Sequence, residues 1–393
     1  MKRYISLLLI TIFLMCAVFG CNKEIVRTDY NVNESDTIKI GVLVPISGEN
    51  KNIGEDIVTG LKYANELAAT VNIDKSYELS LSVHDVNSDV EAAAKKLIDE
   101  KVASIVCYCG SEDKKEEVLK GFETVNTPLL FIDMFADNNN ESTAELATSL
   151  SLSVSASYQA SVAANFLKDK GYKKAAIVYE DNDCYKEYSS SFKKTFGSAT
   201  EYSSDYFNVK TITKDFDCAF VAGSNKFALD VTKKLKSASS GFTVMMPEMF
   251  DKDSVSSSTY NGCYFLSKFE SDSDNHNVTR FISQYTQQNN VSSSDISSAI
   301  VYGYDAYMLV YGALQHFNPM GSDPLASVKN GSAEQTEVTI STRMMLDALK
   351  EKQYLGVVDT NMVFDDKGCI KPTFIYVDSV EGGIATMHKK FVY

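Results

Sequence analysis

The stretch IKIGVLVPISGENKNIGEDIVTGLKYANE, residues 38–66, decides the fold class of this 393-residue chain. It opens on a continuous apolar run, Ile38 to Pro45, which is typical of a strand that is buried on both faces of a sheet. A turn signal follows at Ser47 and Gly48, and apolar residues then recur at intervals of four, three, four and three over residues 55–71. That spacing places them on one face of a helix. The stretch therefore predicts one strand–helix unit of an α/β protein.

Strand-like and helix-like segments keep alternating on both sides of a Ser-rich pause at residues 149–157. Expected strands are 79–83, 103–108, 128–132, 175–179, 219–222 and 243–246, and expected helices are 89–101, 112–125, 158–170, 185–196 and 225–237. This rhythm favours parallel sheet flanked by helices. Because the series after the pause repeats the order of the series before it, we expect two similar α/β lobes.

The last third of the chain departs from this alternation. Helices are expected near 277–289, 298–316 and 341–353, with an irregular insertion at 318–338. The chain is expected to close on a hairpin over 361–376, with NMVFDDKG followed by PTFIYV.

Composition excludes several functional classes. A chain of 393 residues with 44% apolar residues is expected to fold as more than one globular domain. Lys and Arg number 38 against 52 Asp and Glu, which gives a net charge of −14. Loss of residues 1–20 would remove two basic residues and no acidic ones, so that the charge becomes 36 − 52 = −16. Such a chain is a poor binder of nucleic acid and of anionic lipid surfaces.

The first twenty residues are predicted to be a secretory signal. A basic start precedes an apolar run from Leu7 to Phe19, which is shorter than the ~20 residues of a membrane span. Gly20 before Cys21 resembles the bacterial lipobox, although Phe19 is bulkier than usual there. The resemblance implies that Cys21 becomes the mature N-terminus and carries lipid, with polar residues 21–36 as a tether outside the cell membrane. An ordinary signal peptide or an uncleaved anchor is the alternative.

Six cysteines lie beyond Cys21, and two of them, Cys107 and Cys109, would point to one face of a strand. That spacing can indicate metal binding, but no His lies near and no second Cys pair follows. We therefore expect no metal site, and instead small buried residues or an occasional disulfide. The spacing leaves open any pairing among Cys107, Cys109, Cys184, Cys218, Cys263 and Cys369.

Motifs of the common enzyme classes are missing. No G-x-S-x-G elbow, phosphate loop, H-E-x-x-H or C-x-x-C pattern occurs, and the chain has four His. The spacing of Ser47, Gly48 and Gly54 is not that of a dinucleotide-binding loop, so no cofactor is expected. An envelope hydrolase would need a nucleophile, a base and an orienting group, and no such set is visible. The sequence therefore favours a binding protein over an enzyme.

Two α/β lobes would bring strand carboxyl ends and helix N-termini to one cleft, where helix N–H groups suit a ligand carboxylate. The stretch at residues 38–66 resembles the opening of the leucine/isoleucine/valine-binding family, the substrate-binding proteins of branched-chain amino acid ABC transporters. Further similar segments follow in order: VHDVNSDVEAAAKKLIDEKVASIVCYCGS at 83–111, YEDNDCYKEYSSSFKKTF at 179–196, MMPEMF at 245–250 and VFDDKGCIKPTFIYV at 363–377. The resemblance covers nearly all of residues 37–380.

The resemblance implies the class I periplasmic-binding fold, in which three segments cross between two closing lobes. Expected crossovers are near 150–157, 263–270 and 358–366, with lobe 1 from 37–153 and 268–362 and lobe 2 from 154–267 and 363–393. The implied function is a lipid-anchored solute-binding protein of a bacterial ABC importer, which delivers an amino acid or related small polar solute to a permease. An extracytoplasmic ligand sensor or regulator with the same fold is the alternative.

Four site residues carry over from the resemblance. Ser111 falls on the loop that holds the ligand α-carboxylate, although it also suits a helix N-cap. Glu248 falls where the ligand ammonium is received, and a solvated loop Glu is the alternative. Tyr185 falls on the Tyr that covers the ligand from lobe 2, unless it only packs. Asp85 fits a hinge-side structural position.

The sequence also departs from the family. Asp133 stands in the segment where a Thr-containing loop binds the carboxylate, and an acid there would repel a carboxylate or bind a cationic group. Ile53 stands where an aromatic often lines the pocket, and Ser224 where a larger residue is usual. A branched-chain aliphatic ligand is therefore in doubt, and an amide, a urea-like solute or a short peptide stays open.

Overall fold

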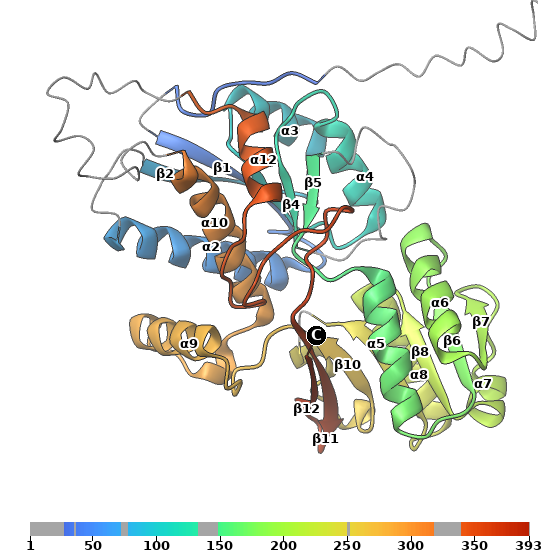
Figure 1. The fold of residues 1–393 in the computed structure, drawn as a ribbon. Coiled ribbons are helices and arrows are strands. Elements are labelled where there is room, and N and C mark those ends of the chain that lie inside the picture. The colour runs from blue at the N-terminus through green and yellow to red at the C-terminus, as the bar shows by residue number, and fades with distance from the viewer. Residues whose placement is uncertain are drawn as a thin grey trace, which may run out of the picture.

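The computed structural model describes residues 27–34, 37–71, 78–132, 148–249, 252–317 and 339–392. The predicted signal, the predicted lipidation site Cys21, the predicted site residue Asp133 and the insertion at 318–338 lie outside these residues. The described chain forms two α/β lobes, which Figure 1 shows one above the other. The predicted fold class, with two lobes joined by three crossovers, is confirmed.

Lobe 1 is built on a parallel sheet with the strand order β2-β1-β3-β4-β5. Its strands are β1 (Thr37–Val44), β2 (Glu78–Asp85), β3 (Ile105–Cys107), β4 (Leu129–Phe131) and β5 (Ser149–Ser151). Its helices are α2 (Lys51–Val71), α3 (Val90–Asp99), α4 (Glu112–Gly121), α9 (His276–Asn289), α10 (Ser298–His316) and α12 (Thr342–Glu351), with a 3-10 turn η4 (Ser293–Asp295). Ile40 and Val42 pack toward α2 and α10, while Leu43 packs toward α3 and α4. This two-sided burial explains why the first strand is continuously apolar.

Helices α2 and α10 pack unusually close because two glycines lie at their contact. A Cβ atom on Gly60 would lie 1.9 Å from the Ile300 carbonyl oxygen, and one on Gly303 would lie 2.2 Å from the Ile57 carbonyl oxygen. Neither backbone has room for a side chain, so the glycines set the spacing of this layer. This contact packs α2, from the first strand–helix unit, against α10, which lies more than 200 residues later in the chain.

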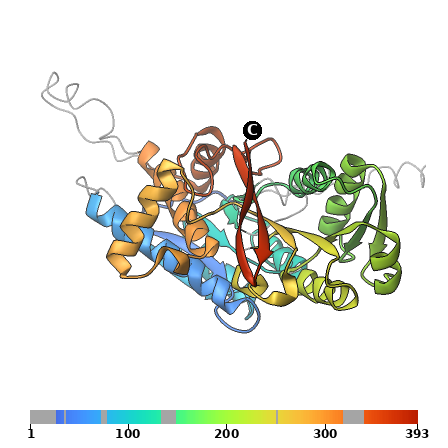
Figure 2. The ribbon, with the colours of Figure 1, turned by 90° about the horizontal axis from the view of Figure 1, so that it is seen from below.

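Lobe 2 is built on a sheet with the strand order β12-β11-β10-β9-β8-β6-β7, in which β11 and β12 run antiparallel. Its strands are β6 (Ala175–Tyr179), β7 (Ala199–Ser203), β8 (Cys218–Ala222), β9 (Thr243–Glu248), β10 (Tyr264–Ser267), β11 (Phe374–Glu381) and β12 (Ile384–Val392). Its helices are α5 (Ala156–Asp169), α6 (Asp183–Phe196), α7 (Val209–Asp215) and α8 (Asn225–Ala238), with 3-10 turns η2 (Lys252–Val255) and η3 (Ser258–Tyr260). Figure 2 shows the β11–β12 hairpin between the helices of the two lobes.

The closing hairpin predicted over 361–376 is only partly right. Phe364 and Ile370 pair as a single antiparallel bridge, and the long hairpin is formed further on by β11 and β12. The bridged turn returns to lobe 1, because the Ser151 N–H donates to the Gly368 carbonyl at 2.7 Å. Both Phe364 and Ile370 belong to the lobe 1 core. The third crossover therefore lies between Ile370 and Phe374, later than the 358–366 expected from the sequence.

Part of the segment expected as a tether, residues 27–34, packs against lobe 1. The Tyr30 hydroxyl donates to the Val102 carbonyl at 2.9 Å, and Val32 is buried in the lobe 1 core. Thr28 and Asn31 form single bridges with Val125 and Ser341. This stretch is thus part of the lobe rather than a spacer. Among the described residues, no helix combines the length and apolar character that crossing a bilayer requires.

Candidate functional site

The carboxyl ends of strands from the two lobes meet at a cavity of about 340 Å³. Lobe 1 contributes the loop after β1 and the start of α2, and lobe 2 contributes α8 and the 3-10 turns η2 and η3. The described residues that line it are Glu49, Asn50, Asn52, Ile53, Asn225, Lys226, Leu229, Asp230, Lys233, Ser254 and Tyr260. Its volume falls in the range of small-molecule sites in proteins.

The first turns of two helices line this cavity, through Asn52 and Ile53 of α2 and Asn225 and Lys226 of α8. Helix α2 begins at Lys51, and α8 begins at Asn225 after the cap Ser224. Neither helix carries an acidic residue in its first turn. Acids do lie near both ends, because the Ser224 N–H donates to Glu180 Oε2 at 2.7 Å and Glu49 stands two residues before α2. Lys226 and Lys233 add full positive charges. This part of the cavity is therefore suited to an anionic group.

The loop between β1 and α2 is held in shape by Asp85. The Ile46 and Asn87 N–H groups donate to its Oδ1 at 3.1 and 3.0 Å, and the Ser47 hydroxyl donates to Oδ2. Burial raises the pKa of Asp85, but the hydrogen bonds from Ser47 and the backbone outweigh it and leave the pKa below its usual value. A Cβ on Gly54 would lie 1.8 Å from the Pro45 carbonyl oxygen. Gly54 therefore lets the first turn of α2 approach the end of β1 more closely than any residue with a side chain would allow.

Ser111 is exposed and caps α4, with the Lys114 N–H donating to its Oγ at 3.4 Å. Glu112 and Asp113 occupy the first turn of α4, so this helix end already has negative charge beside it. Ser111 does not line the cavity, but its loop is adjacent to it. A Cβ on Gly110 would lie 2.6 Å from Asn50 Nδ2.

Tyr185 lies in the first turn of α6 and is half-buried. Its ring packs at the edge of the lobe 2 core, 6.1 Å from the ring of Tyr188. Its N–H donates to the cap residue Asn182 at 3.0 Å. It is not among the described residues that line the interlobe cavity.

Glu248 ends strand β9 and is only 2% exposed. The Tyr302 hydroxyl on α10 donates to its Oε1 at 2.6 Å, which links lobe 1 to lobe 2. Its Oε2 is buried and has no hydrogen-bond partner among the described residues. Burial raises the pKa of Glu248 to about 7, against the opposing effects of the Tyr302 hydroxyl and the Lys268 charge. The carboxyl therefore offers one buried acceptor that the protein leaves unused.

Glu248 belongs to a buried polar network that spans the crossovers. Lys268, on the second crossover, donates to Asp359 Oδ2 at 2.8 Å and to the Phe374 carbonyl. Burial lowers the pKa of Lys268, opposed by the negative charge of Asp359, Glu248 and Asp305. The pKa of Asp305 is raised to about 7 by burial, although two backbone N–H groups donate to it at 2.8 Å.

The first crossover joins the network through Gln159. Its Nε2 donates to the Val154 carbonyl at 2.9 Å, and its Oε1 accepts the Glu248 N–H at 3.1 Å. The sequence analysis named Glu248 as a ligand group, which stays a prediction, and did not identify Tyr302, Lys268 or Asp359 as its buried surroundings. A signal did exist for Asp305, which interrupts an otherwise apolar helix.

The six cysteines beyond Cys21 are all buried. Burial raises the pKa of Cys218 to about 12 and that of Cys263 to about 11, so both thiols stay protonated near neutral pH. In the part of the chain that the structure describes, no group of three or more His, Cys, Asp or Glu is arranged to hold a metal ion.

A family model described as periplasmic binding protein matches residues 37–350. Comparison with curated protein sequences gave no match. Among solved structures, the leucine-binding protein LivK of Thermotoga maritima is 16% identical, with a TM-score of 0.70, and the match covers 90% of this chain and 99% of that one.

Two further structures match with a TM-score of 0.68. One is the branched-chain amino acid substrate-binding protein LivJ of Streptococcus pneumoniae in complex with isoleucine, 16% identical over 91% of this chain and 99% of that one. The other is a solute-binding protein of R. palustris in complex with benzoate, 17% identical over 89% and 95%. These likenesses show the fold, and the family model covers most of the chain. The chain therefore belongs to the periplasmic binding protein family.

Proposed function

We propose that the protein captures an amino acid, or a related small polar solute with a carboxylate, between its lobes and delivers it to the permease of a bacterial ABC importer. The observation that carries the proposal is the cavity that the first turns of α2 and α8 line together. Lys226 in the first turn of α8 and Lys233 two turns further along that helix line the same cavity, so a carboxylate there would meet positive charge.

The same cavity has acidic side chains for the other end of a zwitterion. Glu49 lies on the lobe 1 side and Asp230 on the lobe 2 side. The unused Oε2 of Glu248, which is buried and not among the described residues that line the cavity, would be a further acceptor for an ammonium group. A solute that contacts both lobes favours the closed form over the open form, which is how binding drives closure.

The residues identified by the family resemblance would make further contacts with the solute. Glu248 would accept the ammonium, and Ser111 and Tyr185, which follow β3 and β6 at helix starts, would contact the solute when the lobes close. Asp133 stays a prediction. We also keep the proposal that residues 1–20 are cleaved and that Cys21 carries the lipid that anchors the protein outside the cell membrane.

A calorimetric titration with amino acids and their carboxamides tests the binding step. The acids should bind, and the amides should bind at least tenfold more weakly because they lack the carboxylate. K226A and K233A should weaken binding of the acid. K234A is the matched control, since Lys234 lies next to Lys233 on α8 but faces Phe207 rather than the cavity. Equal loss in K233A and K234A would refute the proposed placement.

The transport step needs a second measurement. Uptake of the labelled solute should fall in cells that produce K233A in place of the native protein, and should be normal in cells that produce K234A. Tight binding without any dependence of uptake on the protein would refute the import role while leaving the binding site intact.

A further inference from the structure

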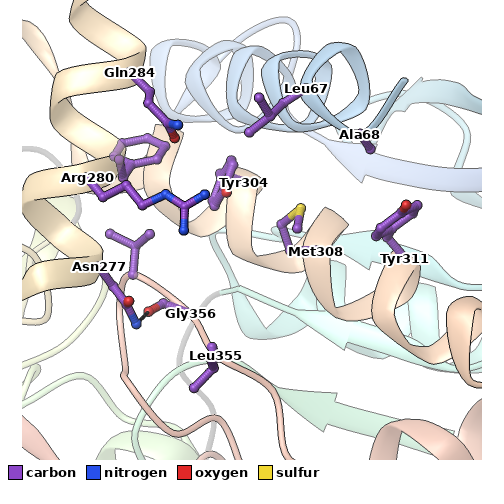
Figure 3. Close-up of a pocket in the computed structure, with 12 residues that line it drawn as sticks. Leu67, Ala68, Asn277, Arg280, Gln284, Tyr304, Met308, Tyr311, Leu355 and Gly356 are labelled. Carbon is purple, nitrogen blue, oxygen red and sulfur yellow. Dashed lines mark hydrogen bonds between the residues drawn. The ribbon is translucent and has the colours of Figure 1, made fainter. Parts of the chain in front are cut away.

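A second pocket, of about 260 Å³, lies in lobe 1 and shares no lining residue with the interlobe cavity. Figure 3 shows it between α9, α10 and the end of α2, with the chain at Leu355 and Gly356 closing the other side. The described residues that line it are Leu67, Ala68, Asn277, Arg280, Phe281, Gln284, Tyr304, Met308, Tyr311, Leu355, Gly356 and Val357.

The walls of this pocket are aromatic and aliphatic. The rings of Phe281 and Tyr304 pack edge to face with centroids 4.9 Å apart, and Met308 and Tyr311 continue the same face of α10. Leu355 stands at the rim with 74% of its surface exposed. An exposed leucine beside an apolar pocket provides apolar surface that a bound ligand could bury.

One cation faces this apolar surface. Arg280 is one of four arginines in a chain with 34 lysines, and Figure 3 shows it reaching from α9 toward Tyr304. No carboxylate of the described residues lies within ion-pair distance of its guanidinium, and no Asp or Glu lines the pocket. A guanidinium presents a planar pair of donors that matches a carboxylate and also stacks on aromatic rings.

Tyr304 supplies a second donor. Its hydroxyl donates to no acceptor among the described residues. Burial, followed by the charge of Asp305, raises the pKa of Tyr304 to about 12, while Arg280 lowers it. The hydroxyl therefore keeps its proton at neutral pH and remains a donor for an anion held by Arg280.

Hydrogen bonds between side chains and backbone fix the walls of the pocket without an occupant. Asn277 Nδ2 donates to the Gly356 carbonyl at 3.0 Å and fixes α9 to the opposite wall. The Val357 N–H donates to Asp305 Oδ2 at 2.8 Å. A Cβ on Gly356 would lie 2.1 Å from Met362 Sδ, so the wall is packed from behind. A preformed shape lowers the ordering cost of binding.

We propose that this pocket is a second small-molecule site, which takes an apolar organic anion such as an aromatic or branched aliphatic carboxylate. Its acid would pair with Arg280 and Tyr304, and its apolar body would lie against Phe281, Met308 and Leu355. An amino acid fits this pocket poorly, because the lining has no carboxylate for the ammonium. The interlobe cavity, which has charges of both signs, selects a different class of ligand.

Titration calorimetry with benzoate, 3-phenylpropionate and 4-methylpentanoate tests the proposal, with the three matching amides as neutral controls. At least one acid should bind, and its amide should bind at least tenfold more weakly. R280Q should weaken the acid at least tenfold, and R280K should fall between R280Q and the native protein. R343Q, at an exposed arginine that lies outside the pocket, and the cleft variant K226A should stay within twofold of the native protein.

Three outcomes would overturn the second site. One is the absence of saturable binding for all three acids. Another is binding that R280Q leaves unchanged, in a variant whose melting curve shows that it is folded. The third is loss of acid binding in K226A with full binding in R280Q, which would place the acid in the interlobe cavity instead.

Discussion

Replacing Glu248 by Gln tests the buried carboxyl on which the interlobe network depends. The substitution keeps the side-chain shape and an oxygen that accepts from Tyr302, but removes the ionisable group. In the folded protein burial raises the pKa of Glu248 from its ordinary value of 4.5 to about 7. The folded state therefore keeps a proton that the unfolded state releases between about pH 4.5 and pH 7.

The sign and size of the effect follow from this difference. Because the folded state binds the extra proton, its contribution to stability is complete below about pH 4.5 and is lost as the pH rises through about 7. Each pKa unit corresponds to about 1.4 kcal/mol, so Glu248 alone accounts for a fall of about 3 kcal/mol in the free energy of unfolding. The glutamine side chain of the E248Q variant has no proton to lose in this range. E248Q should therefore match the native protein near pH 5 and exceed it by about 3 kcal/mol near pH 8.

Urea denaturation of both proteins at pH 5, 6, 7 and 8 measures this difference. The native curve should fall with pH, and the E248Q curve should fall less. It should not become flat, because the pKa of Asp305 is also raised to about 7 and has the same sign. E116Q, at an exposed glutamate of α4, should follow the native curve. A constant difference between E248Q and the native protein from pH 5 to pH 8 would refute the reasoning.

Two further predictions concern packing and charge. G60A should lower the free energy of unfolding by at least about 3 kcal/mol, because its Cβ would lie 1.9 Å from the Ile300 carbonyl oxygen. The control G241A should change it by less than about 1 kcal/mol, because a Cβ at Gly241 would have nothing within 4 Å. Denaturation curves that show equal losses for the two variants would contradict this prediction. K268M should lower the free energy of unfolding by about 3–5 kcal/mol, because the buried Asp359 carboxylate would lose its cation. Adding D359N to K268M should restore part of this loss.

The central strands of both sheets could be predicted from the sequence, because burial on both sheet faces requires continuous apolar runs. The elements that were not predicted lack such runs. Strand β12 has the sequence IATMHKKFV and lies at a sheet edge with most of its residues exposed, so its pattern is weak. Strand β7 and helix α7, with five and seven residues, are too short to show a clear period.

Less of the candidate site than of the fold could be predicted from the sequence. Ser111 and Glu248 were assigned from the family resemblance, and their role in ligand binding stays a prediction; Glu248 ends a strand and Ser111 follows one, where ligand groups gather in α/β folds. The partners of Glu248 could not be predicted, because Tyr302 and Lys268 lie 54 and 20 residues away and meet it only when the crossovers form. Helix ends of similar sequence also differ in the charge of their first turns. The first turn of α4 carries its own acids, whereas that of α8 does not.

The Glu248 carboxyl connects the buried network to the proposed mechanism. It lies on lobe 2 and accepts from Tyr302 on lobe 1, so any opening that separates these residues would break the bond and admit water. Water would favour the ionised form, and closure would again disfavour it. Closing the empty protein therefore carries the cost of protonating Glu248, whereas an ammonium at its unused Oε2 would keep the ionised form paired. On the proposed function, this difference biases the lobes to close on a cationic group, and E248Q should lose that bias together with its affinity for the solute.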